Sequence, residues 1–421
     1  MTALGNARVV TPAGVLDRGF VVVERGTIVS VGAGAAPAPA EDLAGAWLVP
    51  GFIDLHLHGG GGHAVTASRH DMAAALAFHR GHGTTRALVS LVTAPPALLA
   101  RQLGWVADLT EAGTSGALGA HLEGPFLSHA RCGAQNPAHL LAPDRDTFAR
   151  LAEAARGRLR SVTLAPELPG ALGLISDVLD AGAVASIGHT DAGYAEARAA
   201  IEAGVSLATH LFNGMRPLHH RDPGVIGAAL DSGLACEVIN DGVHVHPAIT
   251  ALVGRQPRNL VLVTDAIDAA GVGDGEFELG GQRVRVRHGQ ARLAGSGTLA
   301  GSTLTMDDAL RRAVLDSHLP IEVAAAAAAG NPARVLGIDD RCGAIAAGLD
   351  ADLVVLDADL RVRRVMAGGR WCETGSTAGP GSTAGSGSTA GPGSTAGPGS
   401  TAGPGSTAGS GAAAVRSVSG Q

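Results

Sequence analysis

The strongest constraint on the fold is an alternation that repeats eight times between residues 52 and 335. Short apolar runs rich in Val, Leu and Ile alternate with Ala-, Leu- and Arg-rich stretches whose apolar residues recur at helical spacing. Eight such strand–helix repeats predict an α/β fold, a closed parallel (β/α)8 barrel of the TIM type. The eight strand-like runs are 51–56, 84–92, 116–124, 161–167, 183–190, 205–213, 235–244 and 259–266.

The two ends of the chain carry a different pattern. The first 49 residues and residues 351–370 contain short runs dominated by Val and Ile, broken by Gly and Pro, without a helical period. We therefore expect a small β-sandwich domain formed by both termini, residues 1–51 and 336–373, around a barrel domain at 52–335.

Two further stretches depart from this plan. Residues 276–298 alternate polar and apolar residues around a Gly-Gly pair, which predicts a β-hairpin inserted into the last strand–helix unit. From residue 375 to 410 the pentapeptide GSTAG occurs six times, each time followed by Pro or Ser. No copy carries a large apolar side chain, so we predict a disordered tail over 374–421 without a catalytic role.

Charge and composition argue against several classes of function. The chain has 421 residues, a formal net charge of -7 and no long basic run, which disfavours binding to nucleic acid. It has no apolar run of membrane length, and its first residues do not read as a signal peptide. The four cysteines show no C-x-x-C spacing. We expect a reduced, cytoplasmic protein that binds neither nucleic acid nor membrane.

Side chains that bind metals gather where the predicted strands end. His56 and His58 close the first apolar run and, being two residues apart in a strand, point to the same face. The active sites of such barrels lie at the C-terminal ends of the strands, and imidazole and carboxylate are common metal ligands. Recurrence at this position favours a metal site over a purely structural role. The other residues at strand ends are Glu123, His189, His210, His244 and Asp265.

Nine motifs carry a resemblance to a known family. Through them, over residues 1–373, the chain resembles the amidohydrolase superfamily and, within it, the N-acetylglucosamine-6-phosphate deacetylase family. H-x-H alone is typical of the superfamily, whereas EGPF, THLFNGM and DGVHV are more specific. The motifs are PGFIDLHLHG (50–59), HLEGPFLS (121–128), GAQNP (133–137), IGHTDA (187–192), THLFNGM (209–215), HHRDPG (219–224), INDGVHV (239–245), VTDAI (263–267) and AGSTLTM (300–306).

The resemblance implies a barrel with a small β-sandwich domain and a metal-dependent hydrolase. The reaction it implies converts N-acetyl-D-glucosamine 6-phosphate to D-glucosamine 6-phosphate and acetate, in amino-sugar catabolism and cell-wall recycling. An unactivated acetamide needs a strong nucleophile, and a divalent cation supplies one by lowering the pKa of bound water towards ~7.

The resemblance also implies the ligands of that cation. Glu123, His189 and His210 match the main metal site, and His56 and His58 would hold a second cation with Glu123 as the bridge. We expect one or two cations per subunit, zinc first, with iron, cobalt or manganese as alternatives. The chain contains no lysine, so the amidohydrolase subtype that bridges its metals with a carboxylated lysine is excluded.

Asp265 is the expected general base. It follows the last apolar run, and the resemblance places it beside the reacting water, whose proton it would pass to the departing amine. A helix N-cap is the structural alternative for an Asp at this position.

Further residues are expected to bind the substrate. Asn213 and Gly214 would offer N–H groups to the phosphate and Arg221 a charge-assisted bond, with His244 as a further contact. The resemblance implies that Arg221 reaches into the neighbouring subunit's site, and hence a homodimer.

Two more substrate contacts are expected near the reacting end and the sugar. Gln135 stands where some family members have a histidine that polarises the substrate carbonyl. Because glutamine carries no charge, more of the polarisation would come from the cation. Residues 300–306, ending at Met306, would shape the sugar end of the pocket, or form an ordinary loop and helix start.

Three alternative functions stay open from the residues. The first is an N-acetylgalactosamine-6-phosphate deacetylase, and the second another amidohydrolase acting on a small amide. The absence of lysine and the grouping of Asn213, Gly214 and Arg221 argue against the second. The third, a binding or scaffold barrel without catalysis, is disfavoured because every expected ligand and the Asp are present.

Overall fold

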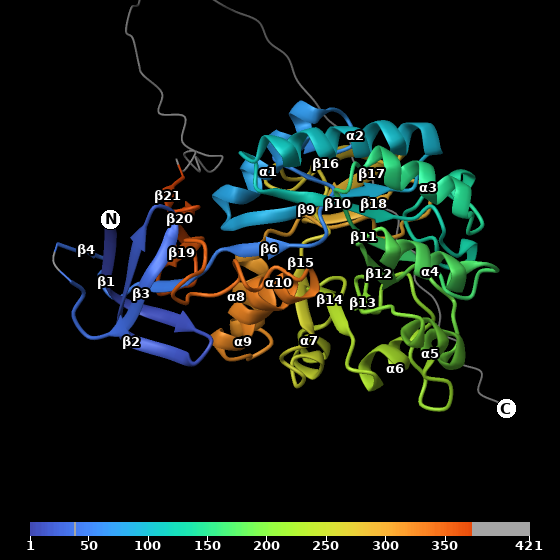
Figure 1. Ribbon diagram of the computed structural model, residues 1–421. Coiled ribbons are helices and arrows are strands. Elements are labelled where there is room, and N and C mark those ends of the chain that lie inside the picture. The colour runs from blue at the N-terminus through green and yellow to red at the C-terminus, as the bar shows by residue number, and fades with distance from the viewer. Residues whose placement is uncertain (38, 373–421) are drawn as a thin grey trace, which may run out of the picture. The chain divides into compact units, whose positions relative to one another are not determined.

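A computed structural model describes residues 1–37 and 39–372 and has the predicted barrel (Figure 1). Its eight parallel strands pair side by side in the chain order of the predicted runs. They are β6 (Phe52–Asp54), β9 (Thr84–Val92), β10 (Ala117–Glu123), β11 (Leu159–Leu164), β12 (Val184–Ile187), β13 (Leu207–Ala208), β14 (Ala235–Ile239) and β15 (Leu260–Val263).

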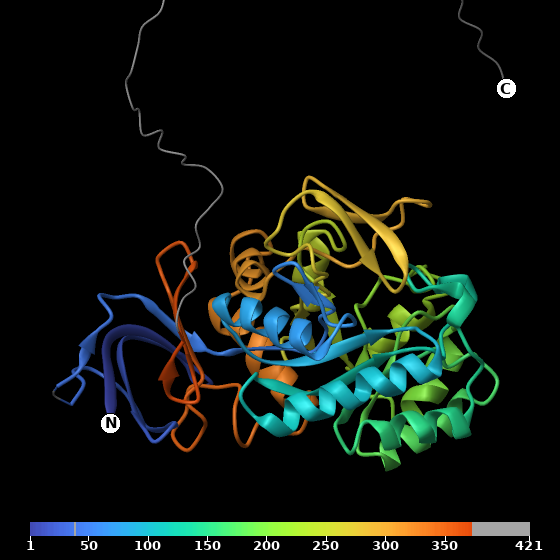
Figure 2. The same cartoon turned by 90° about the horizontal axis from the view of Figure 1, so that it is seen from above.

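Helices cover the outside of the barrel, and α1 and α2 lie along it in Figure 2. In α1 the Ser68 hydroxyl caps the first turn by accepting from the Asp71 N–H, and Met72, Ala75 and Leu76 face the core. The barrel helices are α1 (Arg69–Gly81), α2 (Pro96–Ala112), α3 (Arg145–Ala154), α4 (Ala171–Asp180), α5 (Tyr194–Glu202), α6 (Gly224–Asp231), α7 (Pro247–Val253), α8 (Met306–Leu315), α9 (Ile321–Ala325) and α10 (Asn331–Val335). One π-helical turn (Ala326–Gly330) joins α9 to α10, and short 3₁₀ turns lie at His129–Arg131 and Pro137–His139.

The barrel closes between β6 and β15 through residues at the ends of the two strands and just beyond them. The Thr264 hydroxyl donates to Asp54 Oδ2 at 2.6 Å, and the Asp265 N–H donates to the His56 carbonyl at 2.8 Å. The His58 N–H then donates to the Ala266 carbonyl at 2.8 Å. The seam of the barrel therefore runs through the H-x-H pair and the predicted base.

Strands from both termini form a second sheet, in the order β21–β20–β19–β5–β1–β2–β3 with β4 beside β1. It has its own apolar cluster, which includes Leu4, Val21, Ile28, Leu353 and Met366. The expected association of the two chain ends is thus present, although the exact domain limits stay a prediction. The strands are β1 (Thr2–Thr11), β2 (Gly14–Glu24), β3 (Thr27–Ala33), β4 (Glu41–Asp42), β5 (Trp47–Pro50), β19 (Leu353–Leu356), β20 (Val362–Ala367) and β21 (Arg370–Trp371).

The insertion at 276–298 is a three-stranded sheet, so the predicted two-stranded hairpin is wrong by one strand. β16 (Gly275–Leu279) pairs with β17 (Gln282–Arg287), which pairs with β18 (Gln290–Leu293). The second reversal is a tight turn at His288 and Gly289, both at positive φ. Only the Gly-Gly pair marks a turn in the sequence pattern, so this one was missed. Its apolar side packs on Val92 and Ile267, at the C-terminal edge of the barrel.

The repeat tail that was predicted to be disordered, residues 374–421, lies outside the described residues. None of the helices in the described part of the chain combines the length and apolar content needed to span a bilayer.

The glycine run after His58 is required by close packing. β7 (Gly59–Gly60) pairs with β8 (His63–Ala64) and runs against α1. A Cβ on Gly60 would come within 2.6 Å of His79 Nε2. His79 is fully buried, and its Nε2 bonds the Gly59 carbonyl at 2.9 Å, which holds the loop behind the H-x-H pair.

This contact predicts an acid-sensitive element of stability. Burial lowers the pKa of His79 to about 4, below its unfolded value, so its stabilising contribution is present above pH ~6.5 and is lost as the pH falls. Between pH 7 and pH 5 the free energy of unfolding should fall by about 2 kcal/mol more in the wild type than in His79→Gln. Urea denaturation at both pH values measures this difference, and equal pH dependence of the two proteins would contradict it.

Candidate active site

One group of side chains of the types that ligate metals lies at the C-terminal ends of three barrel strands. Glu123 ends β10, and His189 and His210 lie two residues beyond β12 and β13. Glu123 Oε1 is 3.1 Å from His189 Nε2 and 3.0 Å from His210 Nε2, and the two Nε2 atoms are 3.1 Å apart. All three residues are buried, so the ligand set predicted from the sequence is assembled in one place.

A second group lies beside it at the seam of the barrel. His56 Nε2 is 3.1 Å from His58 Nε2, and Asp265 Oδ1 lies 3.1 Å from His58 Nε2 and 3.5 Å from His56 Nε2. Glu123 also contacts this group, at 3.5 Å from His56 and 3.3 Å from His58. Glu123 therefore touches both groups, as a bridge must, and Asp265 joins the second group as a third donor.

The local backbone aims three of these side chains into the barrel. His189, His210 and Asp265 have φ values of 46°, 29° and 49°, in the left-handed region. Each stands two residues after its strand ends, where a left-handed residue turns the chain sharply over the barrel mouth. His and Asp tolerate this region better than most residues, at a cost of about 1 kcal/mol each.

The other ring nitrogen of three histidines is held by a fixed partner. His56 Nδ1 lies 3.1 Å from Glu237 Oε2, and His58 Nδ1 lies 3.0 Å from the Ser90 carbonyl. His189 Nδ1 lies 2.9 Å from the Arg131 carbonyl. An Nδ1–H that donates to these acceptors leaves the Nε2 lone pair free to face the centre of the site.

The electrostatics of the site favour positive charge at its centre. Burial would raise the pKa of Glu123, but the surrounding histidines outweigh it and keep the pKa well below its usual value. Burial likewise raises the pKa of Asp265, and His56 and His58 lower it to about 2. For His58, burial lowers the pKa, and the two carboxylates raise it to about 9. Both carboxylates are thus ionised and stabilise positive charge among the rings, which protons on His56 and His58 supply at neutral pH and which a bound cation would supply by replacing those protons.

These donors fit a divalent metal. In each group two Nε2 atoms face one another at 3.1 Å beside a carboxylate oxygen. Imidazole nitrogens and carboxylate oxygens converging in a buried site are the donors that zinc and similar cations take.

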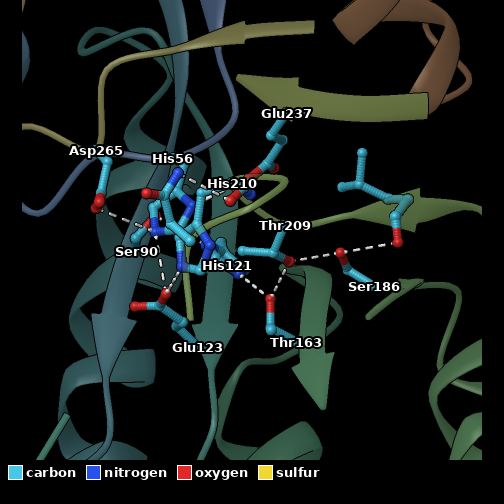
Figure 3. Close-up of polar contacts among 12 residues, drawn as sticks. His56, Ser90, His121, Glu123, Thr163, Ser186, Thr209, His210, Glu237 and Asp265 are labelled. Carbon is cyan, nitrogen blue, oxygen red and sulfur yellow. Dashed lines mark hydrogen bonds and ion pairs between the residues drawn. The ribbon is translucent and has the colours of Figure 1, made fainter. Parts of the chain in front are cut away.

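A polar network beneath the site was missed by the sequence analysis (Figure 3). His121 contacts the Ser90 hydroxyl at 2.9 Å and the Thr163 hydroxyl at 2.8 Å, and Thr163 continues to Thr209 at 2.7 Å. Glu237 Oε2, besides meeting His56, accepts from the His210 N–H at 3.1 Å. A buried carboxylate costs several kcal/mol unless it is well paired, so a Glu inside the apolar run ACEVI was a signal that could have been noticed.

A cavity of about 370 Å³ opens above the two groups. Of the predicted substrate residues, Gln135, Asn213, Gly214 and His244 line it. Gln135 Nε2 donates to Glu123 Oε2 at 2.7 Å, so this amide contacts the bridging carboxylate directly.

Two predicted substrate residues are not brought into this lining. Met306 is fully buried at the start of α8, and Arg221 is exposed, with its guanidinium on His220 Nε2 at 2.8 Å. Arg292 of β18 does line the cavity, and the sequence analysis missed it. No local signal marks Arg292, because only the folding of the insertion over the barrel edge brings it there.

Comparisons with known proteins agree with this geometry. The model of the amidohydrolase family matches residues 47–372. The chain is 38% identical to the N-acetylglucosamine-6-phosphate deacetylase of Bacillus subtilis (strain 168), over 84% of this chain and 92% of that protein. It is 36% identical to the N-acetylgalactosamine-6-phosphate deacetylase of Escherichia coli O157:H7, over 86% of this chain and 97% of that one.

Solved structures give the same result. The crystal structure of N-acetyl-D-glucosamine-6-phosphate deacetylase from Mycobacterium smegmatis superimposes with a TM-score of 0.85 at 44% identity, covering 88% of this chain and 100% of that one. An aspartate-to-alanine mutant of that enzyme, solved in complex with N-acetyl-D-glucosamine-6-phosphate, gives the same TM-score and identity. The chain belongs to the amidohydrolase family and, within it, to the group of the N-acetylglucosamine-6-phosphate deacetylases.

Proposed function

We propose that this protein hydrolyses the acetamide of N-acetyl-D-glucosamine 6-phosphate to D-glucosamine 6-phosphate and acetate, in the cytoplasm and in amino-sugar catabolism. The observation that carries the proposal is the convergence of two carboxylates and four imidazoles beneath a cavity of about 370 Å³. The family relationship narrows the chemistry to hydrolysis of an amide or a similar bond.

The proposed cofactor is a divalent cation, zinc first, with iron, cobalt and manganese as alternatives. Glu123, His189 and His210 would hold the first cation, and His56, His58 and Asp265 a second one where it is present. A bound cation activates water and polarises the substrate carbonyl.

The residues of the chain do the remaining work. The Asp265 carboxylate, ionised and 8% exposed, accepts the proton of the attacking water and passes it to the nitrogen of the departing amine. The new C–O bond forms first and gives a tetrahedral intermediate. The C–N bond breaks once the nitrogen has received its proton, so acetate and the free amine leave. Gln135 is fixed by the Thr93 N–H, which donates to Gln135 Oε1 at 2.8 Å, and it holds the Glu123 carboxylate in place.

The rim of the cavity orients the phosphorylated sugar. Asn213, Gly214 and His244 line it. Burial lowers the pKa of His244, but Asp241 outweighs this effect and raises it, which favours the cationic form of His244 near an anion. Arg292 adds a second cationic group from the same chain. Arg221, exposed and outside this lining, is proposed to reach the partner subunit's site in a homodimer. Met306, which is buried and does not line the cavity, is proposed to shape the part of the cavity that holds the sugar by packing behind its lining residues.

A second candidate substrate is N-acetyl-D-galactosamine 6-phosphate. The 36% identity to a deacetylase of that compound, close to the 38% identity to the gluco enzyme, supports keeping it as the alternative.

Acetate release from the purified protein tests the proposal. We expect metal-dependent turnover of N-acetylglucosamine 6-phosphate, at least tenfold faster in kcat/KM than of the unphosphorylated sugar, because charge-assisted bonds to phosphate are worth ~1.5–3 kcal/mol each. The galacto epimer carries the same phosphate, so comparing its kcat/KM with that of the gluco compound measures the preference at the sugar ring. Chelation should abolish turnover, and added zinc should restore it. Absence of turnover of all three compounds by the folded, metal-loaded protein would refute the assignment.

Asp265→Asn tests the proton transfer. Because Asn cannot take a proton, kcat should fall by ~10²–10⁴, while the first cation stays bound to residues that are unchanged. The matched control is Asp268→Asn, three residues along and outside the cavity lining, which should keep kcat within twofold. Metal content by elemental analysis accompanies both assays, and near-normal kcat in Asp265→Asn would reject the role.

Glu237 is proposed as a positioning residue, because one carboxylate oxygen holds both the His56 ring and the His210 backbone. Glu237→Ala should raise the Kd for the cation by ~10–100-fold, and Glu237→Gln, which keeps an acceptor oxygen, should recover most of this loss. Competition with a chromophoric chelator measures Kd without reference to activity. Ser186→Ala, in the same barrel interior but without contact to His56, is the control, and an unchanged Kd in Glu237→Ala would remove the role.

A further inference from the structure

A second cavity, of about 590 Å³, lies at the opposite end of the barrel strands. Thr85 and Arg86 at the start of β9 line it, as do Ala117 at the start of β10 and Arg160 near the start of β11. Its other wall is the turn between β20 and β21 of the terminal sheet, with Gly368, Arg370 and Trp371. It shares no lining residue with the cavity above the metal-binding groups.

The cavity concentrates positive charge in a chain whose formal net charge is -7. Six arginines line it against a single carboxylate, Asp352. Arg86 is already engaged, at 2.7 Å from both Asp350 and Asp352, and Arg341 lies 3.6 Å from Asp350. Within residues 1–37 and 39–372 no carboxylate oxygen comes within 4.0 Å of the other four guanidinium groups. These four are Arg80, Arg158, Arg160 and Arg370.

Two of these four arginines are held in unfavourable surroundings. Arg80 Nε is buried and, among the described residues, has no hydrogen-bond partner, while its Nη2 donates only to the Thr114 carbonyl, at 3.4 Å. Arg160 Nη2 donates to the Leu336 carbonyl at 2.8 Å, but within the described residues its guanidinium meets no carboxylate, and burial and the neighbouring Arg158 lower its pKa. A buried guanidinium is usually paired with a carboxylate, as Arg86 is, so Arg80 and Arg160 keep a positive charge that an anion could neutralise.

The composition of the lining indicates what would bind. Guanidinium groups bind phosphate oxygens in pairs, and the exposed Thr114 adds a hydroxyl group. The hydroxyl groups of Thr85 and Thr110, which also line the cavity, already donate to the Phe52 and Val106 carbonyls. The volume lies within the ~300–1,000 Å³ that small-molecule sites span. We propose that this cavity, between the N-terminal ends of β9–β11 and the terminal sheet, is a binding site for a phosphate-bearing small molecule. It is separate from the site of deacetylation and does not depend on the function proposed above.

Calorimetric titration of the full, metal-loaded chain with AMP and with inorganic phosphate tests the site. We expect AMP to bind, and the Kd to rise at least ~tenfold in Arg80→Gln/Arg160→Gln, which removes two charge-assisted contacts. The control Arg283→Gln/Arg287→Gln removes the same charge from exposed positions of β17 and should leave the Kd within twofold. An AMP affinity that is equal in wild type and Arg80→Gln/Arg160→Gln, or absence of binding of both probes at millimolar concentration, would overturn the proposal.

A thermal unfolding measurement separates a binding role from a structural one. Without an anion, the double variant loses like-charge repulsion but also the bonds of Arg80 and Arg160 to the Thr114 and Leu336 carbonyls, so its melting temperature should stay close to that of the wild type. With AMP, the melting temperature should rise in the wild type more than in the variant. If the double variant does not fold, Arg158→Gln replaces it, because the Arg158 side chain is exposed. The Kd of this variant for AMP should rise about threefold or more. A marked loss of stability in both variants, with unchanged affinity in Arg158→Gln, would assign the arginines to the fold instead.

Discussion

The closure of the barrel between its first and last strands is the constraint on which the rest depends. β6 and β15 are short, and backbone and side-chain hydrogen bonds beyond their ends complete the ring, from Asp54 and Thr264 to His58 and Ala266. The same residues that close the sheet therefore carry the second group of metal-binding side chains. Folding and assembly of the site are one event here, since the H-x-H pair and Asp265 reach each other only when the eighth strand meets the first.

The site is organised in layers of charge. Two ionised carboxylates lie among four imidazole rings, and a third carboxylate, Glu237, stands behind His56. Behind these, hydroxyl groups and the neutral His121 satisfy one another in the barrel interior (Figure 3). Burial lowers the pKa of His121, and His56 adds to this effect, so it does not contribute a further charge. This arrangement places the ionised carboxylates, which attract positive charge, at the mouth of the barrel.

Much of this architecture could be predicted from the sequence, because each of its signals is local. Apolar runs mark the eight strands, and a polar residue just after a run, such as Glu123 or His189, marks the mouth of the barrel. What could not be predicted depends on segments that meet only in three dimensions. Arg292 reaches the cavity because a three-stranded insertion folds over Val92 and Ile267, and the arginine cavity joins strand starts to a turn more than 200 residues away in the chain. The Glu inside the run ACEVI was a visible signal, but its tertiary partners, the His56 ring and the His210 N–H, could not be predicted from the sequence.

The left-handed backbone at His189, His210 and Asp265 has a consequence for how this chain can evolve. At such positions glycine or asparagine would relax the backbone, so selection for stability alone would drive these three sites away from His and Asp. A lineage that lost the need for this chemistry would be expected to lose these side chains early, because their replacement would also stabilise the fold. Their joint presence in this chain is what continued use of these side chains predicts.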